Sequence, residues 1–291
     1  MTASIILCAD DYGLSAGQSQ AIVQLAERRR ISAASAIVTA SSWRADATAL
    51  CAMRPTLALG LHINVTDGVP LGNMARFAPD GTLPSLPRVI LGSLMRRLPC
   101  DELRDEIARQ LRAFEHAVGD LPDFIDGHQH VHALPQVSDC LFDVLKHVDP
   151  LRRILLRDPT DAWSRILARR SAVAKASVLT LLTQTFGSKA RAHGYRTNDG
   201  FSGVSHFVPT CKAVTLDFQH ASKNLGPFHV MMCHPGLPVS SHASESSLGV
   251  RRSLEFSALM SQEVLLERVW LPERDAHGSI IWPSADVDCE Q

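Results

Sequence analysis

Carboxylate and imidazole side chains follow the ends of several apolar segments of this sequence. These clusters are Asp10-Asp11, His62, the stretch from Asp126 to His132, and His234. In a parallel α/β fold the carboxyl ends of the strands share one face. We therefore expect the clusters to converge there, although they lie far apart in the sequence.

The types of these residues suit a metal ion that activates water. Asp10 and Asp11 could divide the work, with one acid binding the metal and the other accepting a proton from water. His128, His130 and His132 alternate, which would place all of them on one side of an extended segment, with at least one as a ligand. Each cluster taken alone could also be a solvated turn or a hydrogen-bonded structural histidine.

An oxygen and nitrogen donor set without thiolates suits Zn²⁺, Mn²⁺ or Co²⁺ and, less readily, Mg²⁺. Three protein ligands would leave positions open for water and substrate, as a catalytic site requires. The sequence has no G-x-x-x-x-G-K-[ST] phosphate loop, no G-x-G-x-x-G after its first apolar segment and no G-x-S-x-G. These absences argue against nucleotide-dependent chemistry and favour water over serine as the nucleophile.

The pattern around the clusters alternates between strands and helices. Short apolar runs predict strands over 5–8, 34–39, 57–64, 124–127, 153–156 and 228–233, and amphipathic stretches predict helices over 15–30, 45–53, 103–114, 137–147 and 162–186. Segments 67–99 and 187–206 break the rhythm. We expect the second as a Gly-rich loop and the first mainly as a loop over the substrate site, with a tolerated insertion as the alternative. This alternation predicts a parallel (β/α) barrel, TIM-like and either complete or distorted, as a single domain over residues 1–291. An open doubly wound sheet is the alternative.

The composition narrows the functional class. The chain has 291 residues, 29 Lys+Arg and 30 Asp+Glu, so its formal net charge of -1 gives no sign of a nucleic-acid partner. No apolar run reaches the roughly 18 residues of a membrane span, and the first residues do not resemble a signal peptide. The 7 cysteines are scattered and have no C-x-x-C pair. Reduced thiols and a cytoplasmic location are the expectation.

Four motifs together resemble the YdjC-like carbohydrate deacetylases, which include chitooligosaccharide deacetylase and the hopanoid-associated deacetylases. The motifs are Ala9-Asp10-Asp11-Tyr12-Gly13, Gly60-Leu61-His62, Asp126-Gly127-His128-Gln129-His130-Val131-His132 and Met232-Cys233-His234-Pro235-Gly236. The resemblance implies a (β/α) barrel, one divalent metal ion (Mg or Zn, with Mn or Co as alternatives) and hydrolysis of the N-acetyl group of an acetylated amino sugar or oligosaccharide.

The resemblance also implies roles for particular residues. It gives Asp11, His62 and His128 as metal ligands and Asp10 as the base for the attacking water, and the position of His234 suggests that it protonates the leaving amine. We expect the substrate contacts among Tyr12, Asn64, Asp126, His130, His132, Arg157 and Phe201, although Arg157 and Phe201 could equally be solvated surface residues. The family often forms dimers, so a homodimer is a further expectation.

Other functions remain open at this point. A metal-dependent hydrolase of another amide or lactam fits the same residues, and a non-catalytic sugar-binding barrel is a second alternative. Phosphoester chemistry usually needs Arg or Lys at the site, and none adjoins the four motifs. The motifs do not separate a soluble chitooligosaccharide from a lipid-linked glucosamine, but an apolar groove beside the metal would favour the lipid.

Overall fold

A computed structural model describes residues 4–238, 246–261 and 267–283. Its sheet has seven strands, all parallel, in the order β5-β4-β3-β2-β1-β7-β6. The strands are β1 Ile5–Tyr12, β2 Ala33–Ala36, β3 Ala58–Ile63, β4 Phe124–Gly127, β5 Leu155–Leu156, β6 Gly200–Ser202 and β7 His229–Cys233. Leu156 of the edge strand β5 forms a parallel bridge with Thr197, which lies just before the other edge strand β6. The sheet therefore curls into an incomplete barrel, and the predicted fold class is confirmed.

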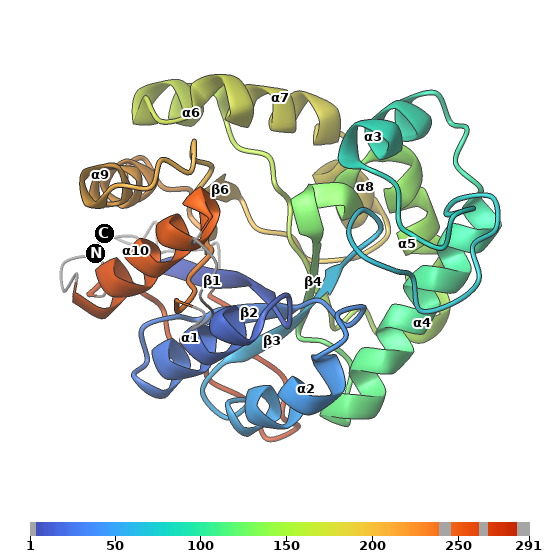
Figure 1. Cartoon of the computed structure of the whole chain (residues 1–291), viewed down its shortest axis with the longest axis horizontal. Helices are drawn as coiled ribbons and strands as arrows, with labels where there is room; N and C mark the ends of the chain where they lie inside the picture. Colours follow the sequence, from blue (N-terminus) through green and yellow to red (C-terminus); the bar gives the residue numbers. More distant parts are fainter. Residues whose placement is uncertain (1–3, 239–245, 262–266, 284–291) are drawn as a thin grey trace, which may run out of the picture.

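Helices surround this sheet (Figure 1). They are α1 Ala16–Glu27, α2 Trp43–Ala52, α3 Leu86–Leu94, α4 Cys100–Val118, α5 Pro135–Val148, α6 Trp163–Arg169, α7 Val173–Thr183, α8 Phe186–Ala192, α9 Cys211–Ala221 and α10 Ser247–Ser261, with the 3₁₀ segment η1 His128–Ala133. In the described ranges, no helix is both long and apolar enough to cross a membrane. The expectation of a single domain over residues 1–291 stays a prediction.

The strands are short apolar runs because both of their faces are covered, as in other parallel sheets. All eight residues of β1 are buried. Ile6 and Cys8 pack into the barrel interior with Phe124, whereas Leu7 packs toward the helices. Gly60 makes room for this interior packing, since a Cβ on it would lie 2.3 Å from the Phe124 ring. Alternation along β1 thus places Asp10 on the interior side, in phase with Ile6 and Cys8.

Three expectations about the connections are wrong. Segment 67–99 is not a loop throughout, because it contains α3, and segment 187–206 is not a loop throughout, because it contains most of α8 and the strand β6. The expected helix over 162–186 is broken between α6 and α7, where Arg170 and Ala172 have positive φ angles of 58° and 43°. An apolar periodicity continued across this break, so the sequence pattern did not reveal it.

Candidate metal centre and active site

An irregular end of β1 lets two adjacent acids reach the same mouth of the barrel. Successive side chains of a regular strand point to opposite faces, which would separate Asp10 from Asp11. Here the pairing of β1 with β2 shifts register between Ala9 and Tyr12, and Asp11 has a φ of 69°. Bulges of this kind re-aim side chains next to active sites. Asp10 consequently keeps its interior direction, while Asp11 turns toward His62 of β3 and His128 after β4.

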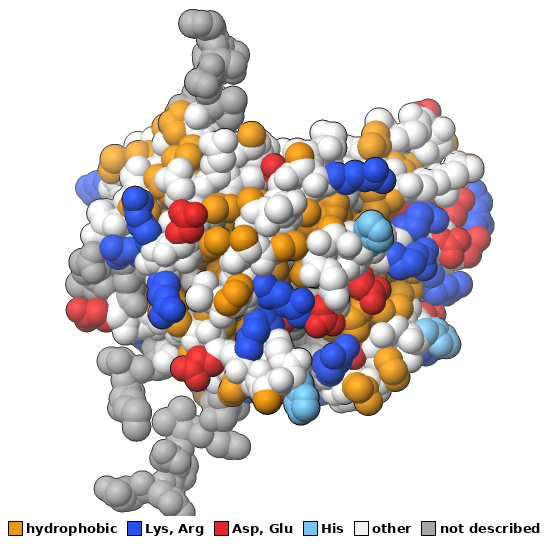
Figure 2. Space-filling model, turned by 90° about the horizontal axis from the view of Figure 1, so that it is seen from below, with side chains coloured by type: hydrophobic (Ala, Val, Ile, Leu, Met, Phe, Trp, Pro, Cys, Tyr) orange, Lys and Arg blue, Asp and Glu red, His pale blue; other side chains and the backbone are white. Residues whose placement is uncertain are grey.

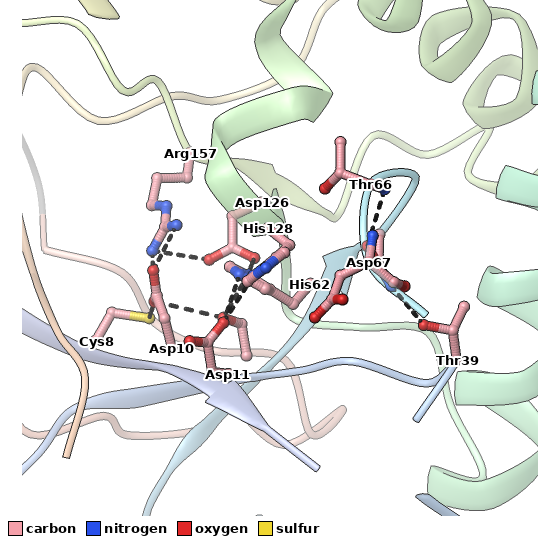
Figure 3. A network of polar contacts seen from close by, with 12 residues as sticks. Cys8, Asp10, Asp11, Thr39, His62, Thr66, Asp67, Asp126, His128 and Arg157 are labelled. Atoms are coloured by element: carbon pink, nitrogen blue, oxygen red, sulfur yellow. Dashed lines mark hydrogen bonds and ion pairs between the residues drawn. The ribbon is translucent and has the colours of Figure 1, made fainter. Parts of the chain in front are cut away.

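Asp11, His62 and His128 bring three ligand atoms together at this mouth (Figure 3). All three atoms lie within 4.8 Å of one another. Asp11 Oδ1 is 2.9 Å from His128 Nδ1 and 3.5 Å from His62 Nε2. One carboxylate oxygen and two imidazole nitrogens that face a common point fit a divalent metal ion. The residues that the family resemblance implied as ligands are therefore the ones that the fold gathers.

His62 is oriented by a second carboxylate. Its Nδ1 lies 2.6 Å from Asp126 Oδ1 and 3.0 Å from Ser35 Oγ, which leaves Nε2 to face Asp11. Ligating histidines usually give their other ring N–H to such a carboxylate. Burial opposes a charge on the ring, but Asp126, Asp11 and Asp10 outweigh it and raise the pKa of His62 to about 10. A metal ion binding at Nε2 would displace that proton.

Asp10 is held in a buried ion pair with Arg157. The guanidinium Nη1 donates a hydrogen bond to Asp10 Oδ1 at 2.7 Å, and Nη2 donates one to Asp10 Oδ2 at 2.8 Å. Nη1 also lies 2.8 Å from Asp126 Oδ2. Burial alone would raise the pKa of Asp10, but the charges of Arg157 and His62 and the hydrogen bonds from Arg157 together outweigh burial and hold that pKa well below its ordinary value. Asp10 therefore stays ionised and fixed in direction. Cys8 donates its thiol to the same Asp10 Oδ1 at 3.3 Å.

The histidine segment after β4 has a different conformation from the one we expected. It is a 3₁₀ turn rather than an extended strand, with positive φ angles at Gln129 and His130. His128 consequently faces Asp11, His130 packs edge-on against Phe201 with ring centroids 5.5 Å apart, and the buried His132 lies with Nε2 2.7 Å from the Arg157 carbonyl oxygen. The expectation that alternation puts all three rings on one side is wrong, because alternation holds only for extended backbone.

A pocket of about 830 Å³ opens above these residues. Its polar end includes the side chains Asp10, Asp11, His62, His128, His130 and His234. Its apolar walls include Leu86 and Ile90 of α3 and Val178 and Leu182 of α7. The His234 ring packs edge-on against Phe207, and its backbone N–H donates to Glu255 Oε2 at 2.7 Å. An apolar groove therefore lies directly beside the candidate metal centre.

Of the seven predicted substrate contacts, His130 lines this pocket and the other six do not. The Tyr12 hydroxyl donates to the Asp46 carbonyl at 2.6 Å, and Asn64 Nδ2 donates to Thr39 Oγ1 at 2.8 Å. Asp126, His132, Arg157 and Phe201 are buried, so the solvated-surface alternative for Arg157 and Phe201 is wrong. Direct contact of these residues with a substrate stays a prediction.

The sequence reasoning named Arg157 only as a substrate contact and missed Arg252 altogether. Arg252 of α10 donates Nη2 to Asp11 Oδ2 at 2.9 Å and lines the pocket. With Arg157 on Asp10, each acid thus has an arginine partner, and the argument that none adjoins the motifs fails in three dimensions. Arg157 comes directly after β5, where the rule of strand ends places site residues. Nothing local in the sequence marks Arg252, which lies on a helix 241 residues from Asp11.

Several known proteins are similar to this chain in sequence or in fold. The family described as YdjC-like protein matches residues 4–266. A chitooligosaccharide deacetylase of Salmonella dublin is 28% identical over 272 residues, covering 92% of this chain and 96% of that protein. A carbohydrate deacetylase of Mus musculus is 27% identical over 250 residues, covering 80% and 78%.

Among solved structures, a protein of Enterococcus faecalis V583 proposed to be a cellobiose-phosphate cleavage protein has a TM-score of 0.65. It is 20% identical and covers 92% of this chain and 95% of its own, which shows a shared fold. The family match extends over nearly all of the chain and includes every residue of the candidate site described above. This chain belongs to the YdjC-like protein family.

Proposed function

We propose that this chain is a metal-dependent carbohydrate deacetylase that hydrolyses the N-acetyl group of an acetylated amino sugar. The observation that carries the proposal is the convergence of Asp11, His62 and His128 beside an independently held Asp10, at the polar end of the pocket. Relatives over most of the chain are named carbohydrate or chitooligosaccharide deacetylases, which supports the same reaction.

Asp11, His62 and His128 would hold one divalent ion, which supplies Lewis-acid activation of water and of the acetamide carbonyl. Asp10 accepts the proton of the attacking water, because Arg157 keeps this carboxylate ionised and aimed at the mouth of the barrel. His234, from the loop after β7, donates a proton to the amine as the C–N bond breaks. The products are acetate and the free amino sugar.

The apolar lining of the pocket favours a lipid-linked amino sugar over a free oligosaccharide. Leucine, isoleucine and valine side chains of α3 and α7 form its walls, as in the pairs Leu86 with Ile90 and Val178 with Leu182. Sugar rings present hydroxyl groups that such walls leave unpaired, whereas a hydrocarbon aglycone gains about 25 cal/mol for each Å² of apolar surface that it buries there. The acetylated sugar would occupy the polar end and its aglycone the apolar groove.

Acetate release tests the proposal. Metal-stripped protein is resupplied separately with Zn²⁺, Mg²⁺, Mn²⁺ or Co²⁺ and assayed on N-acetylglucosamine oligomers and on N-acetylglucosamine with a long alkyl aglycone. We expect metal-dependent release that is lost in Asp10→Asn, with a lower KM for the alkyl substrate. Release that persists in Asp10→Asn, or no release with any metal from protein that binds metal, would count against deacetylation by this site.

A further inference from the structure

The surface helix α7 buries two threonines and leaves two of its large apolar side chains exposed, while Leu179 and Leu182 pack inward. Its sequence, VAKASVLTLLT, has one charged residue, Lys175, and its buried residues are Thr180 and Thr183. Val178 and Leu181 are 55% and 54% exposed. A helix on the surface of a protein in water shows the opposite arrangement, with apolar residues facing the core. The outer face of α7 therefore suits an apolar surrounding better than water.

The helices α3 and α6 also expose large apolar side chains. Leu91 and Leu94 of α3 are 60% and 52% exposed, and Leu167 of α6 is 60% exposed. In the part of the chain that the structure describes, half of the exposed large hydrophobic side chains lie on or directly after α3, α6 and α7: Leu91, Leu94, Met95, Trp163, Leu167, Val178 and Leu181. The three helices lie along one edge of the molecule, at the top of Figure 1. We call this region the α3–α6–α7 surface.

The exposed charged side chains of this region are basic, although Arg165 and Arg169 are paired with Asp161. Between Asp161 and Asp199 the chain has seven Lys or Arg residues and no Asp or Glu, and between Asp80 and Asp101 it has three Arg and no acid. Since the whole chain has a net charge of -1, the remainder is acidic. Arg88, Arg97 and Arg170 are exposed. By contrast, basic and acidic side chains are interspersed on the face where α1 and α2 lie (Figure 2).

We propose that the α3–α6–α7 surface binds peripherally to an anionic lipid bilayer. Exposed leucines next to basic residues are the combination that anchors an interfacial helix, with the apolar side chains in the headgroup region and the cations on anionic lipids. A second copy of this chain fits less well, because a two-fold contact would place two basic surfaces against each other. Nucleic acid would pair with the arginines but leave the apolar side chains in water.

The surface is continuous with the pocket, since α3 and α7 contribute both to it and to the apolar walls. Val178 belongs to both, being 55% exposed and also lining the pocket. A lipid-held substrate could then pass from the bilayer into the groove without exposing its hydrocarbon part to water. This consequence rests on the proposed deacetylase function, whereas the binding of the bilayer does not.

Vesicle flotation of the full chain tests the surface without any substrate. The probes are vesicles of phosphatidylcholine alone and of phosphatidylcholine with phosphatidylglycerol. The variants are Leu91→Glu and Leu181→Glu, which are exposed and outside the pocket lining, and Arg88→Gln; the matched control is Leu151→Glu, on a leucine that is 77% exposed elsewhere. Circular dichroism checks that each variant is folded, and gel filtration records its oligomeric state.

We expect binding to the anionic vesicles that weakens with salt. Each leucine variant should bind on the order of tenfold more weakly, and Arg88→Gln about fivefold more weakly, while Leu151→Glu binds as the parent does. The inference is overturned if neither vesicle binds, or if Leu91→Glu and Leu181→Glu bind as well as Leu151→Glu. It is also overturned if those two variants only convert a dimer into a monomer. Acetate release from soluble oligomers, measured in parallel, separates any of these results from a failure of the deacetylase proposal.

Discussion

Replacing Asp126 with Asn should weaken metal binding without removing any metal ligand. The Asp126 carboxylate lies 2.6 Å from His62 Nδ1 and 2.8 Å from Arg157 Nη1. Asn keeps an oxygen acceptor for His62 but loses the negative charge. A hydrogen bond to a charged group is worth roughly 1 kcal/mol more than a neutral one, which corresponds to about a fivefold to tenfold loss of metal affinity. Asp126→Ala removes the acceptor as well, so we expect a loss of roughly a hundredfold.

The assay is a calorimetric titration of metal-stripped protein, followed by kcat and KM at saturating metal. We expect the Asp126→Asn dissociation constant to rise as stated, with KM within about twofold of the parent, because Asp126 is fully buried behind His62. Asp123→Asn is the matched control. Asp123 immediately precedes the same strand, accepts the Leu59 N–H at 2.8 Å and pairs with Arg274 at 2.7 Å, so its loss should lower stability and leave metal affinity unchanged.

An Asp126→Asn variant with unchanged metal affinity and a strongly raised KM would refute this reasoning. Asp126 would then contact the substrate, as the sequence pattern suggested, rather than orient a ligand. Equal losses of metal affinity in Asp123→Asn and Asp126→Asn would refute it differently. They would show that affinity follows the stability of the barrel and not the orientation of His62.

Three further outcomes follow from single positions. Asp11→Ala should abolish metal binding in the same titration, because it removes the carboxylate oxygen shared by both imidazoles. Burial, opposed by the hydrogen bond to the Arg157 carbonyl, lowers the pKa of His132 to about 4. Below pH 6.5 the unfolded state therefore binds a proton at His132 that the native state excludes. The free energy of unfolding, measured with urea, should fall by about 1.4 kcal/mol per pH unit from pH 6.5 toward pH 4. The fall should be less steep in His132→Asn. Gly60→Ala should lose roughly 1–3 kcal/mol in the same measurement, since its Cβ would meet the Phe124 ring at 2.3 Å.

The sequence predicted the parts of this site that follow strand ends. Apolar runs followed by ionisable residues identify β1, β3, β4 and β7 together with Asp10, Asp11 and His62, since buried parallel strands are read directly from such runs. The turn at Gln129 and His130 was not predictable in this way, because two adjacent non-glycine residues with positive φ follow no common sequence rule. Arg252 was missed because α10, which packs against α1 and α9, brings it to the site, and tertiary packing leaves no local pattern.

The different roles of the two adjacent acids come from backbone geometry rather than from residue type. Asp10 and Asp11 are chemically identical and both buried, yet Asp10 pairs with Arg157 while Asp11 meets two imidazoles. On a regular strand one of them would point away from the barrel interior, and a single acid could not both bind a metal and remain free to accept a proton. The positive φ at Asp11 brings the second acid to the mouth beside the first. Because such a conformation costs a non-glycine residue of order 1–3 kcal/mol, it persists only where surrounding contacts hold it, and here Arg252 and His128 do so.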